Sequence, residues 1–144
     1  MKLIMIFLKD SCIFTHKEGE YEPVLGDYLG EFTNEIDKTK GSYIREIVAS
    51  APKAIAYVYD TGVSHAICKG IAINNIAKLK INFETMKEIV LEDNDIKIEV
   101  EQLQFIRNKS DWTMRTEVGN KTYKYTFSKR VVLENKYDTL PYGF

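Results

Sequence analysis

Ser50-Ala51-Pro52-Lys53-Ala54-Ile55-Ala56-Tyr57 is the stretch from which the fold of this chain is predicted. Proline has no N–H group to donate to a strand ladder, so Pro52 marks either the beginning of a strand or its margin. The side chains that follow alternate as far as Tyr59, which indicates a strand at the edge of a sheet. Asp60-Thr61-Gly62 is a turn signal, so the chain is expected to reverse there.

The returning strand is predicted between Ser64 and Ile73, and it includes Cys68-Lys69-Gly70. Lys53 on the first strand and Lys69 on the returning arm together suit a backbone phosphate of a nucleic acid. In the alternative interpretation, Lys53 keeps an edge strand soluble and prevents it from pairing with another chain. Both interpretations stay open at this point.

Composition sets the broad class of the protein. The chain has 144 residues, enough for one domain or two small lobes. Its 44% apolar and 28% charged residues are typical of a soluble globular chain. The net charge of -1 does not indicate a nucleic-acid partner. Residues 105–130, however, hold seven basic and two acidic side chains, which gives this segment +5 and leaves -6 for the rest.

The cysteines and the N-terminal segment favour an intracellular protein with no membrane segment. Cys12 and Cys68 are isolated thiols without CxxC spacing, as is usual for reduced cysteines. His16 and His65 have no metal-ligand spacing around them, so no function is assigned to them. The apolar run from Leu3 is six residues long, too short for an export signal or a membrane span.

An N-terminal hairpin is predicted instead. Residues 3–8 are expected to form a buried strand, and Cys12-Ile13-Phe14 its antiparallel return. Asp10 then lies in the turn. Its carboxylate either bonds to nearby backbone N–H groups, as aspartate does in turns, or ligates a metal ion, and spacing alone does not decide between the two.

Three helices are expected from periodicity and capping. The first runs from Asp27, its N-cap, to Lys38, with an apolar face made of Leu25, Leu29, Phe32 and Ile36. The second covers residues 43–48 and leads into Pro52. The third follows the N-cap Asn82 and has the apolar residues Phe83, Met86, Ile89 and Val90.

The last third is expected to be a hairpin. Ile96, Ile98 and Val100 alternate with charged residues, and the shift of parity before Leu103 and Phe105 indicates a bulge. Val118-Gly119-Asn120-Lys121 is predicted as a two-residue turn that pairs Trp112 with Phe127, Met114 with Tyr125 and Thr116 with Tyr123. This register sets Arg115 opposite Lys124, a like-charge pair that a phosphate would stabilise. The alternative is a solvated face on which the two side chains spread apart.

Five short motifs occur in a fixed order: Gly19-Glu20-Tyr21-Glu22-Pro23, Leu25-Gly26-Asp27-Tyr28-Leu29-Gly30, Ala51-Pro52-Lys53, Lys69-Gly70-Ile71 and Thr139-Leu140-Pro141-Tyr142-Gly143-Phe144. With these motifs the chain resembles the C-terminal end of a protein-primed family B DNA polymerase, of the Polinton/Maverick type. The resemblance covers nearly the whole chain. It implies that residues 1–75 are the C-terminal part of the palm and residues 76–144 the thumb.

The resemblance also implies a remnant of a metal site. Residues 6–11 correspond to the palm motif Y-x-D-T-D-S, and Asp10 takes the place of its second aspartate, which binds the catalytic metal ions. Leu8 and Lys9 replace the first aspartate and the threonine, and a leucine cannot ligate Mg²⁺. The two-metal chemistry of polymerases needs carboxylates from separate strands. The family's other palm aspartate, its dNTP-binding lysine and its exonuclease motifs lie upstream of residue 1.

DNA contacts are implied as well. Lys53 corresponds to the lysine of the K-x-Y motif, which holds the primer terminus. Ile55 occupies the tyrosine position, and Tyr57 lies two residues on, hence on the same strand face. The expected DNA-binding residues are Lys53, Tyr57, Lys69, Arg115, Lys124, Lys129 and Arg130. Such contacts would position a duplex without reading its sequence.

The sequence therefore predicts an α+β fold of antiparallel hairpins with two or three short helices. The expected function is that of a DNA-directed DNA polymerase fragment that contributes to primer–template DNA binding in replication and does not polymerise alone. Binding of dNTP and of Mg²⁺ belongs to the intact enzyme, and the missing palm and exonuclease portion is a candidate partner. The alternatives are a degenerate α+β module with no DNA role and an unrelated intracellular interaction domain.

Overall fold

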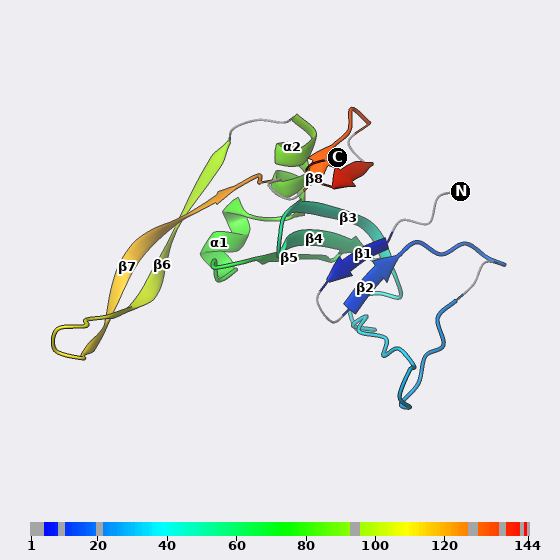
Figure 1. Cartoon of the computed structure of the whole chain (residues 1–144), viewed down its shortest axis with the longest axis horizontal. Helices are drawn as coiled ribbons and strands as arrows, with labels where there is room; N and C mark the ends of the chain where they lie inside the picture. Colours follow the sequence, from blue (N-terminus) through cyan, green and yellow to red (C-terminus); the bar gives the residue numbers. More distant parts are fainter. Residues whose placement is uncertain are drawn as a thin grey trace. The chain divides into compact units, whose positions relative to one another are not determined.

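The computed structural model describes residues 5–8, 11–19, 22–92, 96–126, 130–135, 138–141 and 143. Its strands are all paired antiparallel and are accompanied by two helices in this part of the chain, which confirms the α+β class. The chain divides into two compact units, residues 1–38 and residues 39–144 (Figure 1). This division does not coincide with the boundary expected at residue 75.

The first unit contains the predicted N-terminal hairpin. Strand β1 (Met5–Leu8) pairs with β2 (Ser11–Phe14), with Met5 opposite Phe14 and Leu8 opposite Ser11. The hairpin prediction is confirmed. The two residues at its tip, Lys9 and Asp10, lie outside the described residues.

The helix expected over residues 27–38 is wrong. This segment is a loop with one parallel bridge between Leu25 and Phe32, and the Glu31 carboxylate accepts a hydrogen bond from the Tyr28 N–H at 2.9 Å. Gly30 has a φ of 97°, which a right-handed helix does not contain. Leu29 is fully exposed, so the apolar stripe that suggested a helix is not buried as a helix face.

The second unit is built on a three-stranded antiparallel sheet. It consists of β3 (Ile44–Ala51), β4 (Ala54–Tyr59) and β5 (Ser64–Cys68), in that order. The reversal at Asp60-Thr61-Gly62 is confirmed, although β5 ends at Cys68. The helix expected over residues 43–48 is wrong, because Ile44, Ile47 and Val48 lie on a strand, where β-branched residues pack well.

The prediction that Pro52 begins an edge strand is also wrong. Pro52 and Lys53 form the turn between β3 and β4, and β4 is the central strand. Proline fits a turn for the same reason that it fits a strand margin, because its missing N–H is not needed there. Alternation alone could not show that another strand precedes Pro52.

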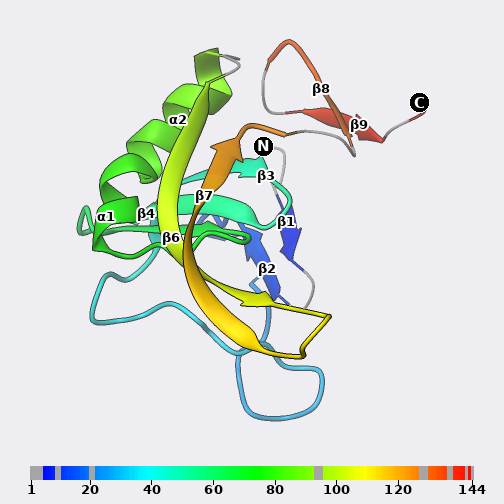
Figure 2. The same cartoon turned by 90° about the vertical axis from the view of Figure 1, so that its left-hand side faces the viewer.

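Two helices pack beside the sheet (Figure 2). Helix α1 (Asn75–Lys80) was not expected; its N-cap Asn74 accepts hydrogen bonds from the N–H groups of Ile76 and Ala77. Helix α2 (Phe83–Glu92) is the helix predicted after Asn82, whose side-chain oxygen accepts from the Thr85 N–H at 3.1 Å. Such caps each stabilise a helix by about 1 kcal/mol.

One apolar core joins these elements. It contains side chains from one face of the sheet, from both helices and from the strands that follow: Val48, Ala54, Ala56, Val58, Ile71, Ala77, Ile81, Phe83, Met86, Ile89, Val100 and Tyr123. Burial of a large apolar side chain stabilises a fold by about 1.5–3 kcal/mol. The core therefore links residues on both sides of position 75 into one unit.

A long β-ribbon extends from this core (Figure 1). Strand β6 (Lys97–Arg107) pairs with β7 (Met114–Lys124) in one unbroken register, from Lys97 opposite Lys124 to Arg107 opposite Met114. The bulge expected before Leu103 is therefore wrong. A short hairpin of β8 (Arg130–Val132) and β9 (Thr139–Pro141) follows.

The turn predicted at residues 118–121 is wrong as well, because these residues lie within β7. The ribbon turns at residues 108–113, where the side chains of Asn108 and Asp111 accept hydrogen bonds from the N–H groups of Ser110 and Thr113. Gly119 leaves space for the end of the Gln104 side chain, whose nitrogen would lie 2.2 Å from a Cβ at this position. The β6–β7 register sets Met114 opposite Arg107 and Thr116 opposite Phe105 in place of the partners expected around that turn, and Phe127, the expected partner of Trp112, lies outside the described residues.

Candidate nucleic-acid interface

Two of the predicted DNA-binding lysines lie side by side at one end of the three-stranded sheet. Lys53 is in the turn before β4, and Lys69 directly follows β5. The Lys69 N–H donates to the Lys53 carbonyl oxygen at 3.0 Å, next to the pair Ala54 and Cys68. The hairpin inferred from the sequence thus places these two residues together. Lys53 is not on a strand, however, and its φ of 62° is left-handed.

The turn that carries Lys69 is held against the ribbon. The Gln102 side chain on β6 donates to the Gly70 carbonyl at 3.1 Å and accepts from the Ala72 N–H at 2.9 Å. Both polar ends of one amide are therefore used to fix this turn. The lysine pair consequently has a defined position relative to β6.

Tyr57 lies on β4 and faces aromatic neighbours. Its ring stacks on His65 with a centroid distance of 5.3 Å and meets Tyr59 edge-on at 5.5 Å. Partial burial lowers the pKa of His65, and the charges of Lys40 and Lys78 lower it further, which favours the neutral imidazole. Tyr57 lies two residues after Ile55 on β4, hence on the same strand face as expected, whereas Lys53 lies in the turn before this strand.

The predicted pair of Arg115 and Lys124 does not exist. Arg115 is opposite Ile106, and its Nε lies 2.6 Å from the Glu117 carboxylate. Lys124 is opposite Lys97 at the base of the ribbon. Lys124 therefore does lie opposite a like charge, but this charge is that of Lys97 and not that of Arg115. Sequence reasoning missed Lys97 because the turn had been placed within β7.

The remaining predicted residues are dispersed or not described. Arg130 on β8 donates from Nε to the Thr139 hydroxyl at 2.5 Å and from Nη2 to the Thr139 carbonyl at 2.9 Å. Its guanidinium group is therefore partly occupied within its own hairpin. Lys129 lies outside the described residues, as does Asp10. No group of three or more His, Cys, Asp or Glu side chains that could hold a metal ion is present in the described part of the chain.

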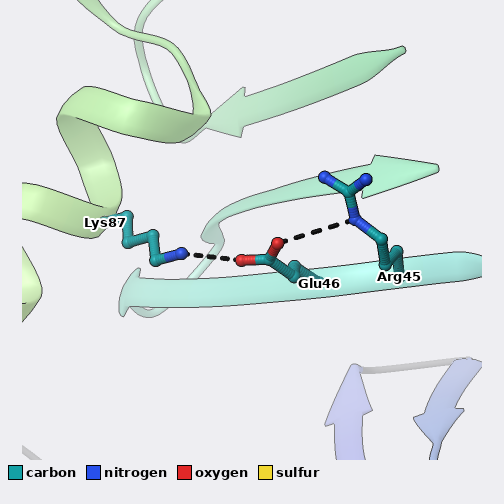
Figure 3. A network of polar contacts seen from close by, with 3 residues as sticks. All are labelled: Arg45, Glu46 and Lys87. Atoms are coloured by element: carbon teal, nitrogen blue, oxygen red, sulfur yellow. Dashed lines mark hydrogen bonds and ion pairs between the residues drawn. The ribbon is translucent and has the colours of Figure 1, made fainter. Parts of the chain in front are cut away.

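A second charged network joins the sheet to α2 (Figure 3). Lys87 Nζ lies 2.7 Å from Glu46 Oε2, and Arg45 Nε lies 3.6 Å from Glu46 Oε1. The hydrogen bond and the charge of Lys87 lower the pKa of Glu46, and Glu46 raises the pKa of Lys87 in turn. We interpret this network as a structural link between β3 and α2.

An open hollow of about 390 Å³ lies beside this network. Its lining combines backbone and side chains of both charges, namely Arg45, Val58, Gly62, Ser64, Asn82, Phe83 and Glu84. The lining thus includes one basic residue, Arg45, and one acidic residue, Glu84. This mixed lining does not favour an anionic ligand such as a phosphate.

Comparisons with known proteins find no relative of this chain. No family model, no curated protein and no solved structure matches the chain. The resemblance to a polymerase therefore stays a prediction. Within the described residues, none of the helices is long and apolar enough to cross a membrane.

Proposed function

We propose that this chain binds the sugar–phosphate backbone of duplex DNA without reading its sequence. The observation that supports the proposal is the contact between Lys53 and Lys69, which places two exposed ammonium groups at neighbouring backbone positions. Lys97 and Lys124 form a second such pair at the base of the ribbon. The end of the palm and the thumb of a protein-primed family B DNA polymerase would hold primer–template DNA through contacts of this kind.

Lys53 and Lys69 have no countercharge within ion-pair distance in the described part of the chain. Two like charges side by side repel each other, and a phosphate between them reverses the sign of the interaction. Each phosphate that is neutralised also releases condensed counterions, which favours binding at low salt.

The proposal assigns no chemical step to this chain. It assigns no role to Mg²⁺ in this chain, and the one expected metal ligand, Asp10, lies outside the described residues. In the intact polymerase, the dNTP site and the other metal ligands would belong to the upstream palm. A DNA partner places the chain inside the cell, in agreement with its two free cysteines, Cys12 and Cys68.

The test is binding of a fluorescent primer–template duplex, followed by anisotropy from about 50 to about 200 mM salt. Each phosphate contact contributes about 0.9 to the slope of log K against log salt. The variant Lys53→Ala/Lys69→Ala should therefore have a slope smaller by about two and weaker binding to every duplex sequence.

The matched control is Lys17→Ala/Lys38→Ala, which removes the same charge from two other exposed positions. The proposal predicts that this control keeps the wild-type slope. If both variants lose the same DNA affinity, the effect comes from the net charge of the chain and not from the pair of Lys53 and Lys69. Absence of wild-type binding at the lowest salt would favour the degenerate module with no DNA role.

A further inference from the structure

The outer half of the β-ribbon exposes large apolar side chains. Leu103, Phe105, Trp112, Met114 and Val118 are each 68–79% exposed. In the register of the ribbon, Leu103 is opposite Val118, and Phe105 and Met114 occupy the next two rows on the same face. Trp112 joins them from the turn, where the Arg107 guanidinium lies 4.8 Å from its ring centroid. We call these five residues the outer patch.

The apolar face of the ribbon changes sides along its length. Near the base, Ile98, Val100 and Tyr123 point to the core, and the face with Lys97 and Lys124 is exposed. Successive side chains of a strand point to opposite faces, so Leu103 and Phe105 belong to the face of Lys97. The apolar side chains of the outer half therefore lie on the face of the ribbon opposite to the face that packs on the core at the base.

From this inverted face we infer that the outer patch binds a second copy of this chain. The five exposed side chains present roughly 700 Å² of surface, about half of it from Phe105 and Trp112, since aromatic side chains have about 150–250 Å² each. Two copies would together bury roughly 1,400 Å², within the range of specific protein interfaces. A patch of this size on a monomer is at the upper limit of what soluble proteins expose.

Charge makes the face complementary to itself. Glu101 lies next to Leu103 toward the base, and Arg107 lies next to Phe105 toward the tip, all on one face of β6. A two-fold axis between Leu103 and Phe105 would stack two ribbons face to face with their strands antiparallel. Glu101 of each copy would then lie over the partner's Arg107.

The same charges disfavour other occupants. Glu101, the charged residue next to Leu103 on this face, would repel a phosphate of DNA or of an anionic membrane placed over the patch, whereas Lys97 and Lys124 lie further toward the base of the ribbon. A second copy would instead place its own Arg107 over Glu101. This inference is independent of the proposed DNA binding, and its test contains no DNA.

The first experiment measures the mass of the full chain by analytical ultracentrifugation across a concentration series. The wild type is expected to dimerise, and Phe105→Asp to weaken the dimer at least tenfold, as loss of a central aromatic residue does. Ile106→Asp is the matched control, because it places the same charge on the opposite face of the same strand. Circular dichroism shows whether both variants keep the fold.

A charge exchange tests the geometry. Glu101→Arg and Arg107→Glu should each weaken the dimer several-fold, and the double variant should restore it, since opposite charges face each other again across the axis. A wild type that stays monomeric overturns the inference. The inference is also overturned if Phe105→Asp leaves the dimer unchanged, or if the double variant does not restore the dimer. Insertion of Phe105 of a monomer into anionic vesicles would overturn it as well.

Discussion

Replacement of Tyr123 by phenylalanine is expected to stabilise the protein. Tyr123 is 2% exposed and belongs to the core, yet its hydroxyl has no hydrogen-bond partner of normal geometry among the described residues. The Ser50 hydroxyl donates to the Ala54 carbonyl at 3.3 Å and lies close enough to lower the pKa of Tyr123, but the approach of the phenol O–H to a lone pair of Ser50 does not reach normal hydrogen-bond geometry. The phenol oxygen has thus lost its water without gaining an equivalent bond.

The size of the effect follows from the cost of such a group. A buried polar group without a partner costs about 1–3 kcal/mol, and removal of the oxygen leaves the ring contacts in place. Tyr123→Phe should therefore raise the free energy of unfolding by about 1 kcal/mol. For a chain of this length, this corresponds to an increase in Tm of about 3 °C.

The pH dependence provides a second readout. Burial, the main cause, raises the pKa of Tyr123 above its usual value near 10, because the neutral phenol is favoured in the core. The wild type keeps this part of its stability below the unfolded pKa and loses it as pH rises toward the folded pKa. The variant has no phenol at this position, so its advantage should grow above pH 10.

Thermal and urea unfolding of both proteins measure these differences. Tyr43→Phe is the control, since Tyr43 is 58% exposed and its hydroxyl reaches water. That substitution should change stability by less than about 0.5 kcal/mol. A Tyr123→Phe variant less stable than the wild type would refute the reasoning, because it would mean that the hydroxyl makes a net favourable bond.

Two further predictions concern charged residues. Lys87 lowers the pKa of Glu46, so their ion pair contributes to stability above the unfolded pKa near 4.5, and this contribution is lost as the pH falls through the folded pKa. The variant Glu46→Gln should therefore show a smaller change of Tm with pH in this acidic range. An unchanged profile of Tm against pH would contradict the prediction. Lys53 has a left-handed φ of 62°, which costs a residue with a Cβ about 1–2 kcal/mol. Lys53→Gly should therefore unfold at higher urea than Lys53→Ala, while the two variants lose the same DNA affinity, and equal unfolding midpoints would refute the strain.

Local signals in the sequence were sufficient where a few neighbouring residues decide the structure. The reversal at Asp60-Thr61-Gly62 and the helix after Asn82 were both predicted, because turn and cap chemistry act over three or four residues. The pairing of Lys53 with Lys69 followed from the first of these reversals. That part of the candidate site could be predicted.

The failures share a different cause. Leu29 and its apolar neighbours have helical spacing, but spacing does not form a helix unless an apolar surface covers it. Gly119-Asn120 has the composition of a tight turn, yet it lies in a strand where Gly119 leaves room for Gln104. Because that turn was predicted at the wrong place, every predicted strand pair in the ribbon was wrong, and Lys97 was not recognised as part of the candidate site.

The shift of parity between Val100 and Leu103 is the feature that sequence and structure explain only together. A strand that covers one core with one face keeps its apolar side chains in a single parity. From the sequence alone, the shift of parity was explained by a bulge that would return Leu103 to the face that packs on the core. The unbroken register excludes this bulge, because Leu103 is 70% exposed on the opposite face. The strand therefore has two apolar faces in succession, and only the first, which contains Val100, is covered by the core. The second face requires a surface that the described part of the chain does not supply, and this requirement leads to a second copy.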